Sequence, residues 1–393
     1  MKYLATILIF TELVTSQTTA PPPTLSPIIQ PITVFPAAAQ NLTSHVRFES
    51  DPFLLPLPIG PSSGLDGPKI DLVNNSVFDW WYFDAVDCNN SNTSLTVTLF
   101  AASSHAFPYL ERSDSVLTAY LWASFPNGTV WTKYMNAELA TVVAVGDGSK
   151  GDWHPTGFSW EGAGDMSRYE VTVKSSEMDV WGKMELVSVA PAHYPCSPAS
   201  AGSGKHTFQV APHIGWSNAV PDATATVNLT IQGEPLTFRG VGYHDKNWSD
   251  QPFLNSVGSW YWGHSRLGPY SLVWFHFLPP NTNNTTTYTS SYVAKDGKIL
   301  VSSCSPTLLS VRPTGPRARY PPRVGEMSEG FHIDFDLGEG DNGGVLSINV
   351  TATAEIATDR KSYTRWAGTV SGGLVGGEVY EGAAIFEQFE VDT

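Results

Sequence analysis

Short runs of alternating apolar and polar residues, each closed by Gly, Pro, Asn or Asp, recur along most of this chain. Clear examples are Leu95–Phe100, Tyr169–Val173 and Ala225–Ile231. An alternation of period two places every second side chain on one face of a β-strand. No long stretch keeps a helical period with capping residues, and β-branched and aromatic residues dominate the regular segments. The sequence therefore predicts an all-β protein whose short strands form two β-sandwich or barrel domains.

The chain is long enough for two hydrophobic cores, because its 393 residues exceed the size at which one core stops growing. Lys2, the apolar run Leu4–Phe10 and the small residues that follow predict a signal peptide over residues 1–20. Repeated prolines predict an extended linker outside the fold over residues 21–40. We expect an N-terminal β domain over residues 41–245 and a C-terminal β-barrel domain over residues 246–393.

Ten N-x-S/T triplets support a secretory route, and we expect a secreted protein or one held in a secretory or vacuolar compartment. The candidate glycosylation sites are Asn41, Asn74, Asn89, Asn92, Asn127, Asn228, Asn247, Asn283, Asn284 and Asn349. The three cysteines, Cys88, Cys196 and Cys304, allow at most one disulfide, and the sequence leaves its pairing open.

The formal charge of −15 disfavours nucleic acid and anionic lipid as partners. The N-terminal apolar stretch is too short for a membrane anchor, and no other stretch approaches the roughly 20 apolar residues needed to span a bilayer, so we expect no membrane association after signal removal. The expected partner is a hydrophobic small molecule.

Aromatic and ionisable residues share three short stretches, Phe78–Asp84, Gly242–Trp248 and Trp260–His264. Aromatic side chains supply apolar area, while Asp, His, Lys and Tyr can bind or transfer protons, a mixture typical of an enclosed site for an organic ligand. Trp81, Tyr82 and Asp84 are candidates for an aromatic floor with a carboxylate beside it. The alternative is an ordinary strand with its tryptophans in the core.

A hairpin is expected from Trp260 to Leu278, with Gly268 and Pro269 in its turn. Trp260, Trp262 and His264 share one face of the first strand, and Trp274 and His276 share one face of the second. If these faces coincide, all five side chains line one wall of the site.

The segment Tyr243–Lys246 holds a phenol, an imidazole, a carboxylate and an ammonium in four successive positions. Such groups can polarise a carbonyl or move a proton, which makes Tyr243, His244 and Asp245 catalytic candidates. The alternative is a turn between the two domains. Arg365 and Phe386, in two further mixed stretches near the C-terminus, are candidates for substrate binding.

Other chemistries find little support in the sequence. His244, Asp245, His264 and His276 have no spacing that fixes two metal ligands locally, so we expect no metal. No Gly-x-Ser-x-Gly elbow and no glycine-rich loop between a strand and a helix is present, which disfavours a serine nucleophile and a dinucleotide cofactor.

Three motifs resemble those of the tandem lipocalin-like superfamily, which includes bacterial carotenoid hydratases and fungal natural-product Diels-Alderases. They are Asp79–Asp84, Gly240–Trp248 and Trp260–His264, and their order and spacing match along nearly the whole mature chain. The resemblance implies a lipocalin-like barrel as the second domain, a ligand cavity between or within the domains, and no cofactor. The leader and the sequons look most like the hetero-Diels-Alderases of tropolone sesquiterpenoid pathways.

In that branch, a tropolone o-quinone methide adds across an alkene of a humulene-type sesquiterpene. By this resemblance Tyr243, His244 or His264 would donate a hydrogen bond to the tropolone oxygen, and Asp84 or Asp245 would assist dehydration. His264 stands where many relatives carry Arg, so its role is the least supported. The alternatives are a decalin-forming intramolecular Diels-Alderase, an isoprenoid hydratase, and a carrier of hydrophobic metabolites without catalysis.

Overall fold

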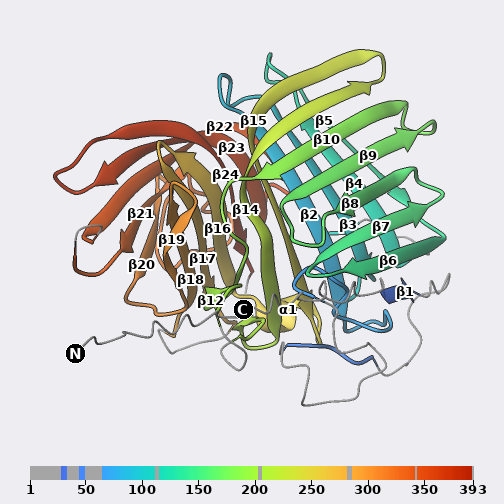
Figure 1. Ribbon diagram of the computed structural model, residues 1–393, viewed down its shortest axis with the longest axis horizontal. Coiled ribbons are helices and arrows are strands. Elements are labelled where there is room, and N and C mark those ends of the chain that lie inside the picture. Colours follow the sequence, from blue (N-terminus) through green and yellow to red (C-terminus); the bar gives the residue numbers. More distant parts are fainter. Residues whose placement is uncertain are drawn as a thin grey trace, which may run out of the picture.

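The computed structural model describes residues 28–32, 44–48, 64–110, 115–201, 206–280, 286–340 and 343–391, the first of these by backbone alone. Two curled antiparallel sheets make up the fold, which confirms the predicted all-β class (Figure 1). The described residues contain one helix, the short α1 (Phe253–Ser256). The expected signal peptide, residues 1–20, lies outside the described residues.

The first sheet has the strand order β1-β6-β7-β8-β9-β10-β14-β15-β2-β3-β4-β5, with β11 to β13 at its side. Its strands are β1 (Ile28–Ile32), β2 (Phe78–Asp87), β3 (Ser94–Ala102), β4 (Leu117–Ser124), β5 (Val130–Asn136), β6 (Leu139–Val145), β7 (Gly148–His154), β8 (Phe158–Gly162), β9 (Arg168–Ser175), β10 (Val180–Ser188), β11 (His193–Tyr194), β12 (Ser197–Pro198), β13 (Gln209–Ala211), β14 (Ile214–Ile231) and β15 (Glu234–Ser249).

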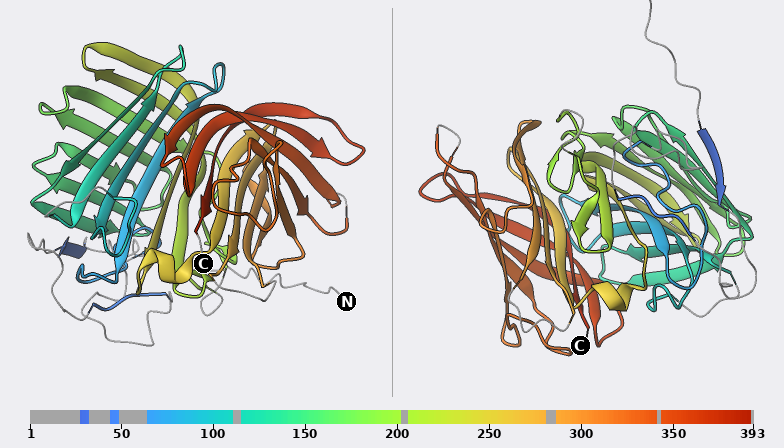
Figure 2. Two further views of the ribbon diagram at one scale, coloured as in Figure 1. Left: turned by 180° about the vertical axis from the view of Figure 1, so that it is seen from behind. Right: turned by 90° about the horizontal axis from the view of Figure 1, so that it is seen from below.

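The second sheet has the order β19-β18-β17-β16-β24-β23-β22-β21-β20. Its strands are β16 (Ser259–Leu267), β17 (Tyr270–Leu278), β18 (Tyr288–Lys295), β19 (Lys298–Ser303), β20 (Leu309–Thr314), β21 (Gly330–Asp336), β22 (Val345–Thr358), β23 (Tyr363–Leu374) and β24 (Tyr380–Glu390). In all three ribbon views the two sheets lie next to each other, and their outer strands curve away from the region where they meet (Figure 2).

The chain changes sheet between Ser249 and Ser259, through α1. The expected boundary at residue 245 falls inside β15, which continues to Ser249 because Asp245–Ser249 keep pairing with Phe78–Tyr82 of β2. The segment Tyr243–Lys246 is therefore strand rather than a turn, and its side chains alternate between two faces.

Three apolar clusters fill the fold. One lies within the first sheet around Trp81 and Phe83, and another lies within the second sheet around Trp274 and Phe331. The third joins both sheets and contains Tyr82, Tyr243, Trp260 and other aromatic residues. Strand β2 and the part of β15 from Gly240 to Ser249 are buried on both faces, so their alternate side chains contribute to different cores.

Residues 28–32, expected to lie in an excluded linker, form strand β1, whose backbone pairs with residues 140–144 of β6. Isoleucine at positions 28, 29 and 32 favours an extended backbone. Pro31 is compatible with this placement because β1 is the last strand of the sheet order.

A disulfide links Cys196, between β11 and β12, to Cys304 after β19, so it ties the first sheet to the second. Cys88 is exposed and is not part of a disulfide. Of the predicted sequons, Asn89, Asn127, Asn228 and Asn349 are exposed, and Asn74 and Asn92 are half-buried, whereas Asn41, Asn283 and Asn284 lie outside the described residues. Asn247 is buried, so the predicted glycosylation there is wrong: a glycan has no space in the folded chain.

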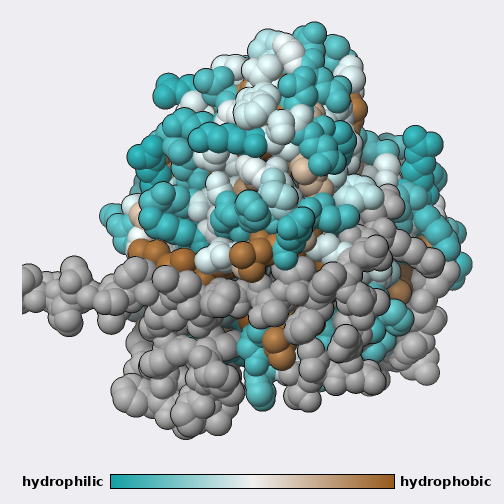
Figure 3. All heavy atoms as spheres, turned by 90° about the vertical axis from the view of Figure 1, so that its right-hand side faces the viewer, coloured by the Kyte–Doolittle hydropathy of each residue, from teal (hydrophilic) through white to brown (hydrophobic). Residues whose placement is uncertain are grey.

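The surface seen from the first sheet is mainly hydrophilic where described residues form it (Figure 3). The described part of the chain has no helix with the length and apolar character needed to cross a membrane.

Candidate active site

A cavity of about 230 Å³ lies between the two sheets. Most of its wall is aromatic, and its ionisable side chains are few. The lining residues are Trp80, Tyr82, Thr98, Phe100, Phe107, Tyr109, Leu110, Tyr120, Trp122, Asp245, Asn247, Trp260, Trp262, Ala357, Thr358, Asp359, Tyr363, Arg365, Glu387 and Phe389. Five predicted site residues are among them: Tyr82, Asp245, Trp260, Trp262 and Arg365.

Asp245 is the buried carboxyl group on the β15 side of this cavity. Its Oδ2 accepts hydrogen bonds from Tyr243 Oη at 2.7 Å and from Trp216 Nε1 at 2.7 Å. Burial raises the pKa of Asp245 to about 7, although both of these hydrogen bonds oppose the rise. Burial also raises the pKa of Tyr243 well above 10, so Tyr243 stays a donor at neutral pH.

A buried ion pair forms another part of the wall. Arg365 Nε and Nη2 each lie 3.0 Å from Oε2 of Glu387, which also accepts a hydrogen bond from Tyr363 Oη. These side chains meet because Arg365 of β23 is directly paired with Glu387 of β24. The guanidinium lies 4.7 Å from the ring centroid of Tyr82, a cation–π contact that helps to hold the phenol ring in the wall.

Asp84, Tyr243 and His264 lie behind the wall rather than in it. Tyr82 Oη donates to Asp84 Oδ2 at 2.5 Å, and His264 Nε2 lies 2.9 Å from Asp84 Oδ1. The ring of His264 stacks on Tyr243, with centroids 4.4 Å apart. These three residues therefore position Tyr82 and Asp245, which do line the cavity.

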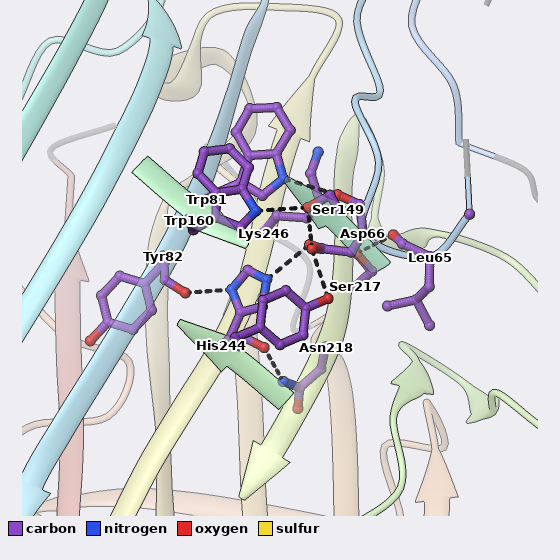
Figure 4. A network of polar contacts seen from close by, with 12 residues as sticks. Leu65, Asp66, Trp81, Tyr82, Ser149, Trp160, Ser217, Asn218, His244 and Lys246 are labelled. Atoms are coloured by element: carbon purple, nitrogen blue, oxygen red, sulfur yellow. Dashed lines mark hydrogen bonds and ion pairs between the residues drawn. The ribbon is translucent and has the colours of Figure 1, made fainter. Parts of the chain in front are cut away.

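His244 and Trp81, two other predicted site residues, face the core of the first sheet (Figure 4). His244 Nε2 lies 3.0 Å from Asp66 Oδ1, and its Nδ1 lies 2.9 Å from the backbone oxygen of Tyr82. The prediction that both residues belong to the site was wrong. Side chains alternate along a strand, so the neighbours of Asp245 and Tyr82, which face the cavity, face away from it.

This second network anchors the strands that carry the site. Asp66 accepts hydrogen bonds from Ser149 Oγ and from Tyr169 Oη, and its backbone oxygen accepts one from Trp81 Nε1 (Figure 4). Next to it, Lys246 of β15 forms an ion pair with Asp79 of β2, and neither side chain is exposed. Polar contacts on one face thus fix the backbone whose other face forms the cavity wall.

Trp274 and His276 also lie away from the cavity, in the core of the second sheet and beneath Tyr320 respectively. The hairpin pairs Trp262 with Phe275 and Tyr261 with His276, so Trp274 and His276 lie on the opposite face from Trp262. A two-residue turn at Gly268 and Pro269 produces this register, and the predicted common face was wrong. Burial lowers the pKa of His276 to about 4.

Phe386 packs against Phe331 and Trp366 in the core of the second sheet, so its predicted contact with substrate is corrected too. Its neighbour Glu387 faces the cavity instead. Asn247 was missed as a site residue because its triplet was interpreted only as a sequon, although it follows Asp245 by two positions and therefore shares its face. Among the described side chains, no three of His, Cys, Asp and Glu gather as metal ligands.

Fold and site together define a lipocalin-like protein with a mainly aromatic cavity between its two sheets and, in the cavity wall, a buried carboxyl group whose pKa is raised to about 7. The family model described as Diels-Alderase-like matches residues 37–312. The quinolone epoxide rearrangement protein penF of Penicillium thymicola is 36% identical over 336 residues, which cover 83% of this chain and 89% of penF. The protein of the same description, asqO of Emericella nidulans, is 35% identical over 337 residues, covering 84% and 88%.

Among solved structures, CghA with Sch210972 is similar in fold, with a TM-score of 0.69 and 18% identity, covering 93% of this chain and 99% of CghA. The chain belongs to the Diels-Alderase-like family. Its relatives indicate an enzyme with pericyclase- or isomerase-type activity.

Proposed function

We propose that the protein isomerises an epoxide carried by an aromatic natural product, without a cofactor, as the names of penF and asqO suggest for those relatives. The observation that carries the proposal is Asp245, a buried carboxyl group in an aromatic cavity with a pKa raised to about 7. A carboxyl group whose pKa is raised into the neutral range can hold its proton there, which suits a general acid.

The proposed reaction needs one proton and returns it. Asp245 donates its proton to the epoxide oxygen while a carbon–oxygen bond breaks, which leaves a carbocation at that carbon. A substituent of the neighbouring carbon then migrates with its bonding electron pair, and the neighbouring carbon becomes a protonated carbonyl. This group returns the proton to the carboxylate of Asp245, so the product is an isomer of the substrate.

The remaining wall supports these steps. Trp260 and Trp262 line the cavity, and aromatic rings stabilise nearby cations. Because the cavity lies between two sheets and most of its wall is apolar, it disfavours the capture of the cation by water.

The test is incubation of the purified protein with a quinolone that carries an epoxide on an alkyl side chain, without added metal or nucleotide. We expect one product with unchanged mass, formed faster than with heat-denatured protein and enriched in one stereoisomer. A product heavier by one water would identify a hydrolase or hydratase instead. A rate equal to that of the denatured control would contradict the proposal.

A stereoselective cycloaddition is the second candidate, and the family description and the aromatic walls favour it. Two aligned π systems need no nucleophile, and alignment alone lowers the barrier. A tropolone o-quinone methide with a humulene-type sesquiterpene remains the substrate pair proposed from the sequence. A single enantiomer of the dihydropyran, absent from the denatured control, would support this candidate.

We also propose that the protein matures in the secretory pathway. The inter-sheet disulfide supports this proposal, because disulfides persist mainly in oxidising compartments. The exposed sequons at Asn89, Asn127, Asn228 and Asn349 support it as well.

A further inference from the structure

Among the predicted glycosylation sites that the structure describes, Asn247 is the one that lines the cavity. It is 2% exposed and follows Asp245 by two residues on β15. Residues two apart on a strand share a face and lie roughly 7 Å apart. Asn247 and Asp245 are therefore neighbouring polar groups on one side of a mainly aromatic cavity.

The orientation of the Asn247 amide follows from its hydrogen bond. Nδ2 donates to the backbone oxygen of Gly215 at 3.2 Å. A backbone oxygen can only accept, so the NH₂ group rather than Oδ1 has to face Gly215. The amide oxygen Oδ1 consequently points away from Gly215, and it takes no part in the hydrogen bond between Nδ2 and the Gly215 oxygen.

The proton of Asp245 can be placed by the same reasoning. Tyr243 and Trp216 both donate to Oδ2, so Oδ2 acts as an acceptor. When the carboxyl group is protonated, the hydrogen therefore resides on Oδ1. The site then presents a donor on Asp245 and an acceptor on Asn247.

We propose that Asn247 Oδ1 and Asp245 Oδ1 form a two-point recognition site for a substrate that carries an N–H donor as well as the oxygen to be protonated, because the two side chains are neighbours on one face of β15. The ligand class is an aromatic lactam, such as a quinolone, whose ring N–H donates to Asn247. The inference rests on the proposed function, because it takes Asp245 as the acid. Asn247 is thus a determinant of specificity.

The test compares two unreactive probes that differ at one ring position, quinolin-2-one and coumarin, in which an oxygen replaces the N–H without added bulk. Quenching of tryptophan fluorescence reports binding, since Trp80, Trp122, Trp260 and Trp262 line the cavity. We expect the wild type to bind quinolin-2-one roughly 10-fold more tightly or better, because coumarin leaves the buried acceptor unpaired and brings its own oxygen against it.

Asn247→Leu should bind the two probes within about twofold of each other, because it removes the acceptor. The matched control is Asn218→Leu, another buried asparagine, which does not line the cavity: its Nδ2 donates to His244 O (Figure 4), and its Oδ1 bonds to Nε2 of His193. This control should keep the wild-type preference. An equal affinity of the wild type for both probes overturns the proposal, whether or not Asn247→Leu folds.

Failure of the proposed function has a separate signature. If the N–H preference depends on Asn247 but no epoxide is isomerised, the recognition site stands and the reaction assignment fails. If epoxides are isomerised and the preference is absent from the wild type, the reaction stands and the role of Asn247 fails.

Discussion

Asp245→Asn is expected to lower the rate of the chemical step by roughly 10²–10⁴-fold, the usual contribution of a general acid. The substituted amide oxygen can still accept the hydrogen bonds from Tyr243 Oη and Trp216 Nε1, so the fold should persist. The amide NH₂ then takes the position of the acidic Oδ1, where it can donate a hydrogen bond but cannot transfer a proton. Single-turnover kinetics with the quinolone epoxide measures this loss.

The matched control is Asp222→Asn, which changes a buried carboxyl group outside the cavity. Asp222 accepts hydrogen bonds from Arg266 and Ser271, and none of these three residues lines the cavity. Its rate should stay within a few-fold of the wild type while the protein is folded. A rate for Asp245→Asn as high as that of this control would rule out Asp245 as the acid.

Lys246→Met should lower the free energy of unfolding by about 3–5 kcal/mol, because it leaves the Asp79 carboxylate buried without its ion-pair partner. Asp79 would keep the hydrogen bond from the backbone N–H of Lys69 at 3.0 Å. The ammonium of Lys246 also lies 4.3 Å from the ring centroid of Trp81, a contact that the variant loses. Urea unfolding followed by tryptophan fluorescence measures the change.

Lys150→Met is the control for this variant, because the partner of Lys150, Glu161, is largely exposed and such ion pairs contribute less than about 1 kcal/mol. Since Lys246 faces away from the cavity, the folded fraction of Lys246→Met should still turn over substrate. Equal unfolding free energies for the two variants would mean that the buried network does not anchor β15.

The sequence predicted the strands well because alternation is a local signal. Leu95–Phe100, Tyr169–Val173 and Ala225–Ile231 all lie in strands, and the hairpin turn falls at Gly268 and Pro269. Alternation also decides which residues of one strand share a face, so Trp260 and Trp262 were correctly grouped. Alternation does not decide which face of a strand lines the cavity. The sequence therefore could not show that Asp245 lines the cavity while His244 faces the core of the first sheet.

Long-range partners account for the other errors. His244 faces Asp66, which is far away in sequence, and no local pattern links the two residues. Trp274 and His276 were assigned to the wrong face because pairing in the hairpin depends on the length of the turn, and a two-residue turn pairs even-numbered with odd-numbered positions. The sequon at Asn247 suggested glycosylation rather than substrate binding, and only the burial of this side chain in the folded chain rules glycosylation out.

The pH dependence of kcat/KM for the quinolone epoxide tests the central claim most directly, because this parameter reports the free enzyme. Burial raises the pKa of Asp245 to about 7, and the protonated form is the acid. Activity should therefore be constant below pH 7 and fall about tenfold per pH unit above it. Activity that rises with pH through 7, or does not change across it, would contradict proton donation by Asp245.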